Sequence, residues 1–230
     1  MPMPIRSVSL TLSLLALFAA VSVPAQVKFA PKKGDSKRYT VKQKMDVGGT
    51  EAEVVSEVQN EIVDVADSGV TLKSTTKSLK IFLNGEQLEP APEANPFEVK
   101  TGKGGELTSV KGGIEGVDTV RQFLVTHFFA PEGDLAKDQP SKRTFEKAGE
   151  VPKLAVETTY LGEDTLNDAK VYKFSQKIVE DGNYGISVES TVWFNAEGVM
   201  VKKEAKFKNL PILVAGADAS GTCTIELNTK

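Results

Sequence analysis

Side chains that commonly catalyse hydrolysis or bind transition metals are scarce in this sequence, which contains one histidine and one cysteine. His127 lies in the stretch VTHFF, and Cys223 alternates with Ile225 along an apolar segment. A Ser-His-acid triad needs a histidine oriented by a carboxylate, and a zinc site needs several nitrogen or sulfur ligands close together. The neighbouring sequence supplies neither arrangement. We therefore expect His127 to be a surface or partly buried structural residue and Cys223 to be a buried, inert thiol.

Acidic residues are plentiful, and the stretches EDTLND and EDGN are the densest candidates for a cation site. Both lack the spaced oxygen ligands and the Gly-x5-Glu ending of a calcium loop, so we interpret them as turns. The 31 acids do not single out two carboxylates at the spacing of a glycosidase pair. A hydrolase with an acid pair is kept only as a third hypothesis. The sequence predicts a protein that is not an enzyme and that needs no metal or cofactor.

Phosphate and nucleic-acid binding are also disfavoured by the sequence. The glycine-rich stretch 102–105 is not followed by Lys-Ser/Thr and leads into a strand, so a β-turn with glycine at positive φ explains it better than a phosphate loop. The net charge is −3, and both signs are interspersed. Only four cations are Arg, at positions 6, 38, 121 and 143, and the four Tyr are scattered. We expect no nucleic-acid partner.

Residues 1–25 have the pattern of an export signal. Arg6 precedes an apolar stretch from Val8 to Val23, and the small residues Val23 and Ala25 predict cleavage before Gln26. This stretch is shorter than the ~20 apolar residues of a membrane span, so we expect no transmembrane segment after cleavage. The sequence lacks a usable Asn-x-Ser/Thr glycosylation site, which favours bacterial export. The expected location is periplasmic or extracellular.

Residues 26–230 are predicted to form a single antiparallel β domain, because apolar and polar residues alternate along most of this range. Near Ile62 the apolar residues change face, which predicts a β-bulge. NAEG at 195–198 predicts a type I turn with Gly198 in the left-handed region. The ranges with strand character are 38–47, 51–66, 70–83, 97–112, 153–162, 171–179, 186–194, 199–207 and 221–228.

One segment, VDTVRQFLVTHFF at 117–129, follows a helical period instead. Its apolar residues recur at three- and four-residue steps, Asp118 can cap the start, and Pro131 stops the continuation, so we predict a helix of about three turns. The proline-containing ranges 86–96 and 130–152 are predicted to be connections. The expected fold is all-β with one main helix: a large curved antiparallel sheet or open half-barrel, with the helix in or against the concave face.

Trp193 and Phe194 are neighbours in a predicted strand, so their side chains point to opposite faces of the sheet. In one interpretation the helix or a long loop covers one face and the core is packed. In the other, the concave face holds a hydrophobic ligand. The apolar stretch 210–216 is interpreted as a core strand or as a plug at the mouth of the cavity. The hypothetical cavity wall consists of Phe123, Phe128, Tyr172, Phe174, Phe194 and Phe207.

The export signal, the long hairpins, the mid-chain helix and the hairpin VWFNAEG followed by a Lys/Glu-alternating strand resemble the periplasmic lipoprotein-carrier (LolA-like) superfamily and related exported bacterial domains of unknown function. The resemblance covers most of the mature chain in architecture and only that hairpin in residues. It implies an antiparallel half-barrel whose hollow accepts lipid acyl chains. The first functional hypothesis is therefore binding or carriage of a lipid or other hydrophobic molecule. The alternative is a non-enzymatic structural or interaction module of the cell envelope, with a packed core and a protein partner.

Overall fold

The structure is a computed structural model, and it describes residues 27, 29–91, 94–114, 116–133, 135–182 and 185–229. The predicted export signal, residues 1–25, lies outside the described residues. The elements in chain order are β1 Ser36–Val47, β2 Thr50–Ala66, β3 Gly69–Leu83, β4 Glu86–Gln87, β5 Ala94–Gly102, β6 Leu107–Ile114, α1 Thr119–Thr126, β7 Pro140–Phe145, β8 Leu154–Leu166, β9 Ala169–Glu180, β10 Ser187–Phe194, β11 Met200–Ile212 and β12 Ala217–Leu227.

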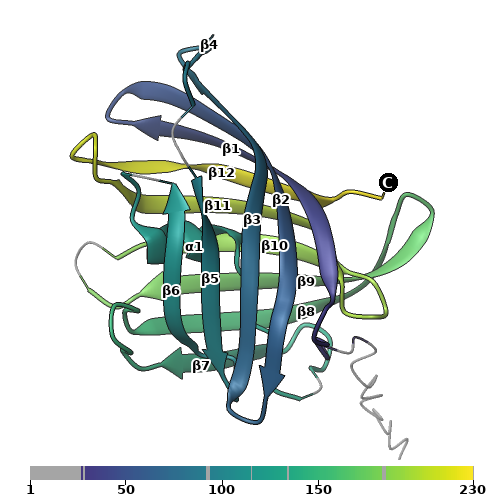
Figure 1. The fold of residues 1–230 in the computed structure, drawn as a ribbon. Coiled ribbons are helices and arrows are strands. Elements are labelled where there is room, and N and C mark those ends of the chain that lie inside the picture. Colours follow the sequence, from purple (N-terminus) through teal and green to yellow (C-terminus); the bar gives the residue numbers. More distant parts are fainter. Residues whose placement is uncertain are drawn as a thin grey trace, which may run out of the picture.

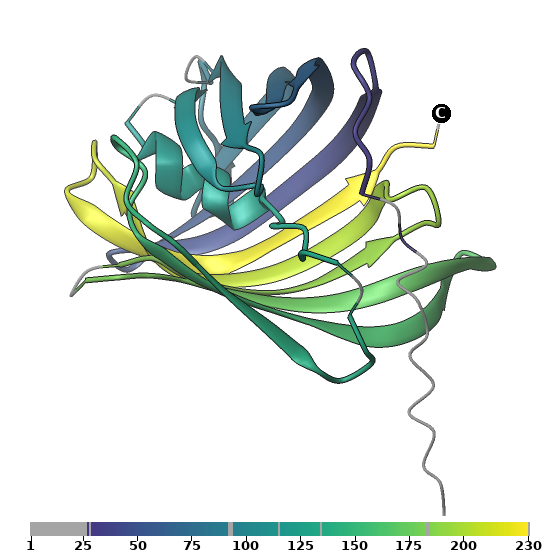
Figure 2. The same cartoon turned by 90° about the horizontal axis from the view of Figure 1, so that it is seen from below.

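The strands form one antiparallel sheet in the order β6-β5-β3-β2-β1-β12-β11-β10-β9-β8-β7, and the short β4 pairs only with β3 (Figure 1). The two edge strands, β6 and β7, do not pair with each other, so the sheet curves without closing into a barrel. Helix α1 lies inside the curve and contacts β6, β11 and β12 (Figure 2). The predicted fold, an open half-barrel with one helix against its concave face, is confirmed.

The pairing of β1 with β12 joins the first and last strands and connects the two arms of the sheet. Gly221 lies in this seam, where an added Cβ would stand 2.0 Å from the backbone oxygen of Lys44. Glycine thus allows a close approach between the strands that no side chain permits. The predicted bulge near Ile62 is present, as a register shift between Ile62 and Asp64 opposite β3. Such shifts add twist and bend the sheet.

Helix α1 begins where the sequence predicts, because the Asp118 carboxylate accepts a hydrogen bond from the Arg121 backbone N–H at 2.9 Å. It ends at Thr126, about a turn earlier than predicted, so Phe128 lies beyond it. The side chain of Gln176 on β9 accepts a bond from the Phe129 N–H at 3.0 Å and donates to the Phe129 carbonyl at 2.8 Å. These bonds replace the helical pairing of Phe129 and draw the chain onto the sheet.

Part of the range 130–152 is not a connection, because β7 lies within it. Only Phe145 of this edge strand is buried, which explains why apolar alternation does not reveal it. In the range 86–96, β5 already begins at Ala94, and Pro96 falls at a register shift in its pairing with β6. Proline is tolerated there because the ladder is already interrupted.

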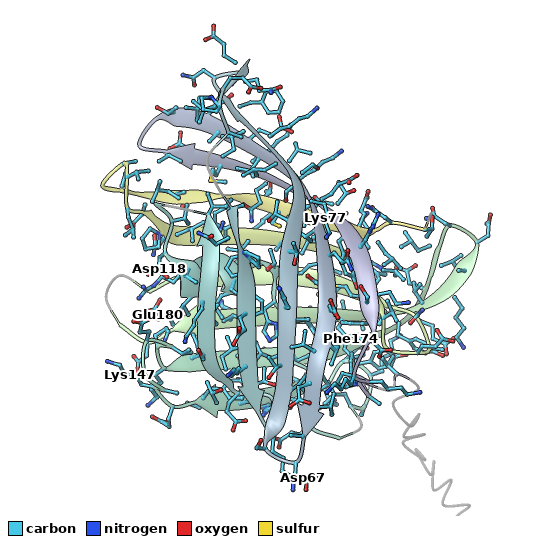
Figure 3. All side chains as sticks on the ribbon, in the orientation of Figure 1. Asp67, Lys77, Asp118, Lys147, Phe174 and Glu180 are labelled. Atoms are coloured by element: carbon cyan, nitrogen blue, oxygen red, sulfur yellow. The ribbon has the colours of Figure 1, made fainter. Side chains whose placement is uncertain are left out.

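The interpretation of EDTLND as a turn is also too broad. Strand β8 runs through Leu166, and the turn is confined to Asn167 and Asp168, which both have positive φ. The turn at NAEG is as predicted: Gly198 has φ 76° and donates its N–H to the Asn195 carbonyl at 3.1 Å. Charged side chains such as Asp67 and Lys147 lie exposed at turns outside the core (Figure 3).

The second face of Trp193 is covered by charged side chains rather than by the helix, a loop or a ligand. Its indole N–H donates to Asp164 Oδ2 at 3.1 Å. The Nζ atoms of Lys173 and Lys202 lie 5.3 and 5.4 Å from the ring centroid. The long lysine side chains cover the indole while keeping their ammonium groups near solvent. Lysine side chains, which neither interpretation named, therefore cover the outer face of Trp193.

Candidate ligand-binding cavity

The inner face of the sheet is unevenly filled. Under β8–β12 the side chains are packed, and Leu154, Ile178 and Val188 are each 0% exposed. Between α1 and β1–β3 a cavity of about 270 Å³ remains. This volume is near the lower end of the roughly 300–1,000 Å³ that small-molecule sites occupy. This cavity brings residues of the helix together with aromatic residues of both arms.

One wall of the cavity is aromatic and aliphatic. The predicted residues Phe123, Phe128 and Phe194 line it. Phe29, which no alternation or helical period singled out, also lies in the wall, 4.9 Å from the Phe194 ring and 5.8 Å from the Phe128 ring, centroid to centroid. Other apolar residues of this wall are Phe97, Ile114, Ala130, Met200 and Ile225.

The other three predicted wall residues are not in the cavity lining. Phe174 packs against the wall, with its ring centroid 5.9 Å from that of Phe128 and 5.8 Å from that of Phe194. Tyr172 belongs to the same aromatic cluster. Phe207 is 2% exposed and is enclosed in the packed core of the second arm. Strand alternation predicted the correct face for all three but not which part of that face is filled.

The opposite wall, from β1, β2 and β3, is uncharged and mixes apolar side chains, such as Tyr39 and Leu79, with polar ones. Its polar residues from β1, β2 and β3 are Gln43, Ser56, Asn60, Ser74 and Thr76. Gln43 is 6% exposed, and its one hydrogen bond runs from Nε2 to the Cys223 sulfur at 3.9 Å. Cys223 is buried as predicted, and burial raises the pKa of its thiol to about 11. The thiol is therefore protonated and unreactive at neutral pH.

His127 contributes a neutral ring to the cavity. It is half-buried and lies between Phe123 and Phe129, with ring-centroid distances of 4.8 and 4.6 Å. Burial, and secondarily the charge of Lys203, lower the pKa of His127 to about 3. The prediction of a partly buried structural histidine agrees with this environment. A histidine that stays neutral and has no carboxylate beside it has the wrong surroundings for a triad base.

Lys203 is fully buried on the inner face of β11, and its ammonium donates to the backbone oxygen of His127. Burial lowers the pKa of this lysine to about 8. It has no carboxylate partner among the described residues. The burial of Lys203 is not evident from the local sequence, because the stretch KKE on a strand is typical of a solvent-exposed face. Its position next to Ala205 and Phe207 on the buried face was the available signal.

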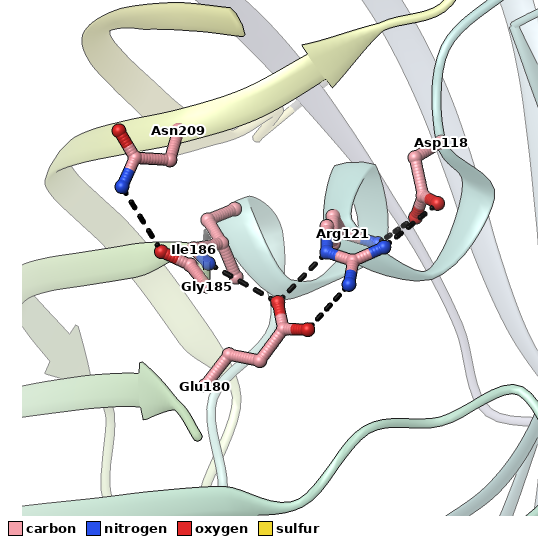
Figure 4. Close-up of polar contacts among 6 residues, drawn as sticks. All are labelled: Asp118, Arg121, Glu180, Gly185, Ile186 and Asn209. Atoms are coloured by element: carbon pink, nitrogen blue, oxygen red, sulfur yellow. Dashed lines mark hydrogen bonds and ion pairs between the residues drawn. The ribbon is translucent and has the colours of Figure 1, made fainter. Parts of the chain in front are cut away.

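A group of ionic contacts fixes α1 across the sheet (Figure 4). Arg121 Nε donates to Glu180 Oε2 at 2.7 Å, Nη2 also pairs with this carboxylate, and Nη1 contacts Asp118 at 3.0 Å. The Ile186 N–H donates to Glu180 Oε2 at 3.1 Å. These contacts raise the pKa of Arg121, with the Glu180 hydrogen bond as the main cause. Because Arg121 engages both carboxylates, their evident role is to hold the helix in place.

The described part of the chain contains no group of three or more His, Cys, Asp or Glu residues placed to hold a metal ion. Within the same residues, no helix is long and apolar enough to cross a membrane. Comparisons of this chain with protein-family models, with curated proteins and with solved structures find no match.

Proposed function

We propose that this protein is an exported, non-enzymatic binding protein that holds or carries a lipid or other hydrophobic molecule in the concavity of its half-barrel. The observation that carries the proposal is the 270 Å³ cavity, which is lined by aromatic residues from both arms and from the helix region. An acyl chain placed there would gain about 0.8 kcal/mol for each methylene removed from water. The resemblance to the lipoprotein-carrier superfamily points to the same class of ligand.

A second hollow of about 300 Å³ adjoins the first and supports an elongated ligand. The two share lining residues, among them Phe29, Asn60 and Leu72. Charged side chains, namely Asp35, Lys37 and Glu197, line only the second hollow. This arrangement is that of an uncharged inner chamber with a charged mouth, which suits a molecule with an apolar chain and a polar end.

Native mass spectrometry of the protein purified from the cells that produce it tests the proposal. We expect a mass above that of the mature chain, and a hydrophobic molecule in the organic extract of the same sample. A ligand-free mass, together with no uptake of any added lipid or hydrophobic probe by the purified protein, would overturn the proposal.

A matched pair of variants connects binding to the cavity. Ser56 is buried and lines the cavity, so Ser56→Phe fills part of it and should abolish or strongly weaken binding. Val55 is its neighbour on the outer face of β2, so Val55→Phe should leave binding unchanged. Equal binding by both variants would place the ligand elsewhere.

The alternative, an interaction module of the cell envelope, is favoured by one observation. Leu213 and Val214 are 64% and 79% exposed at the tip of the β11–β12 hairpin, although Leu210 of the same apolar stretch is buried. The structure thus divides residues 210–216 between core strand and exposed turn. If this tip docks on a protein partner, Leu213→Ser/Val214→Ser should weaken capture of that partner without affecting lipid binding.

A further inference from the structure

The inner faces of β2 and β3 carry a polar stripe, which consists of Ser56, Asn60, Ser74 and Thr76. Asn60 and Ser74 are directly opposite each other in the strand register, and Thr76 follows beside Val58. All four line the cavity. Their side chains make no hydrogen bonds within the described part of the chain. Four adjacent polar groups without protein partners, facing an aromatic wall, form a surface with unused hydrogen-bonding capacity.

Asn60 shows where in the cavity a ligand could form such a hydrogen bond. Its Oδ1 is the one buried side-chain nitrogen or oxygen among the described residues that lacks a hydrogen-bond partner. Leaving a buried polar atom unpaired costs about 1–3 kcal/mol, and a hydrogen-bond donor on a ligand would recover that cost. Asn60 lines both hollows, so the donor would sit where the inner chamber meets the outer one. A plain hydrocarbon chain passing this point would leave the oxygen unpaired.

The lack of charged side chains in the inner chamber limits the class of ligand further. The lining of the inner chamber contains no Asp, Glu, Lys or Arg, and His127 is neutral because its pKa is lowered to about 3. An ionised carboxylate, phosphate or ammonium group would lose water there without gaining a counter-ion, at a cost of several kcal/mol. At the mouth, Asp35 and Glu197 outnumber Lys37, so an anionic end is not favoured there either.

We propose that the ligand is an uncharged lipid that bears hydroxyl groups, of the monoacylglycerol kind, with its chain against the aromatic wall and a hydroxyl donating to Asn60 Oδ1. This inference rests on the proposed function and adds the ligand class. A hydroxyl group both donates and accepts, so it also matches the serine and threonine hydroxyls of the polar stripe. The 270 Å³ chamber holds about nine groups of roughly 30 Å³, the space that one water molecule takes in the liquid. A ten-carbon acyl chain is therefore a suitable probe.

Isothermal titration calorimetry at pH 7.5 on the delipidated mature protein compares 1-monodecanoylglycerol with decanoate, each below its aggregation concentration. We expect the monoacylglycerol to bind at least tenfold more tightly than decanoate. Calorimetry is preferable to intrinsic fluorescence because Trp193 lies on the outer face, among Lys173, Lys202 and Asp164.

Asn60→Leu removes the unpaired oxygen with little change in side-chain size. We expect it to weaken binding of 1-monodecanoylglycerol about tenfold and not to weaken binding of decanoate. Ser74→Ala, which removes the hydroxyl opposite Asn60, should act in the same direction and provides a second variant if Asn60→Leu does not fold. Thr75→Val is the control, because Thr75 lies next to Ser74 in β3 and points to the outer face.

The outcomes distinguish this inference from the proposed function. Equal affinity for decanoate and the monoacylglycerol, or unchanged affinity in both Asn60→Leu and Ser74→Ala, overturns the ligand class while lipid binding itself stands. Failure of the wild-type protein to bind either probe or any other hydrophobic molecule overturns both. Tight, Asn60-dependent and selective binding of the monoacylglycerol supports both.

Discussion

The two arms of the sheet are built from the same alternating sequence pattern, yet their inner faces differ. In the second arm, β8–β12, inner residues such as Leu154 and Ile178 are completely buried. In the first arm, the inner residues Val58 and Leu72 are only partly buried and line the cavity. The comparison shows that an alternating pattern assigns a face to each residue but does not determine whether anything covers that face.

The position of α1 explains why the inner faces of the two arms are packed differently. The helix has eight residues, contacts β6, β11 and β12, and is tied to the β9–β10 connection by Arg121 and Glu180. Gln176 then holds the chain after the helix against β9. A short helix fixed between β6 on one side and β11 and β12 on the other cannot also cover β1–β3. Because the sheet does not close, no other strand covers them either.

The largest effect should come from truncating a leucine on the packed arm. Leu154 is 0% exposed, so Leu154→Ala should lower the free energy of unfolding by about 4 kcal/mol. Leu72 lines the cavity, so Leu72→Ala removes fewer contacts and should cost about 1 kcal/mol. Urea denaturation of both variants measures the difference. Equal losses would mean that the two arms are equally packed.

Breaking the attachment of α1 should have the next largest effect. Arg121→Leu leaves the Glu180 carboxylate, whose side chain is 6% exposed, without its cationic partner. We expect a loss of about 3 kcal/mol in the free energy of unfolding, measured by urea denaturation. Arg38→Leu is the control, since Arg38 is exposed and forms no ion pair within the described residues. A similar small loss in both variants would show that the helix does not depend on this contact.

Replacing the buried lysine should stabilise the protein. Folding lowers the pKa of Lys203 from its ordinary 10.5 to about 8, so the folded state binds this proton more weakly than the unfolded chain does. The resulting penalty is complete below pH 8 and disappears as the pH rises towards 10.5. Lys203→Met should therefore be more stable than the wild type by about 2 kcal/mol at pH 7.

The same variant should lack the rise in stability that the wild type gains between pH 8 and pH 10.5. His127 stays neutral across this window. Burial raises the pKa of the Cys223 thiol from 9.0 to about 11, which lowers stability between about pH 9 and pH 11 in the wild type and the variant alike. The effect of Lys203 is therefore the difference in stability between the two proteins at each pH. Urea denaturation at a series of pH values measures both effects. Lys206→Met, on the exposed face of the same strand, is the control. A destabilised Lys203→Met would show instead that the lysine makes a net favourable contact with His127.

The smallest expected effect is on Trp193. Because it lies on the outer face, under Lys173 and Lys202, its emission should not change when the cavity is filled. Titration with 1-monodecanoylglycerol, followed by tryptophan fluorescence, tests this expectation. A large shift in emission would show that binding changes the outer face of the sheet. It would contradict the expectation that filling the cavity on the inner face leaves the outer face unchanged.

The sequence predicts much of the local structure correctly. Strand positions, the Asp118 cap, the bulge near Ile62 and the turn at Gly198 follow from short-range rules that involve neighbouring residues. The prediction is wrong where a distant residue intervenes. Gln176 ends the helix early, and β7 becomes a strand because β8 pairs with it. Neither effect leaves a pattern in the segment that it changes.

The candidate site likewise combines features that follow from the local sequence with features that depend on distant residues. The sequence by itself determined that aromatic side chains lie on the inner face, since strand alternation and helical period are local and depend only on residue spacing. Only the tertiary structure decided that Phe128 and Phe194 border a cavity while Phe207 is enclosed, and that Asn60 Oδ1 is buried without a hydrogen-bond partner among the described residues. The physical reason is that a cavity is space that several distant elements fail to fill, and their separation depends on how the whole sheet curves.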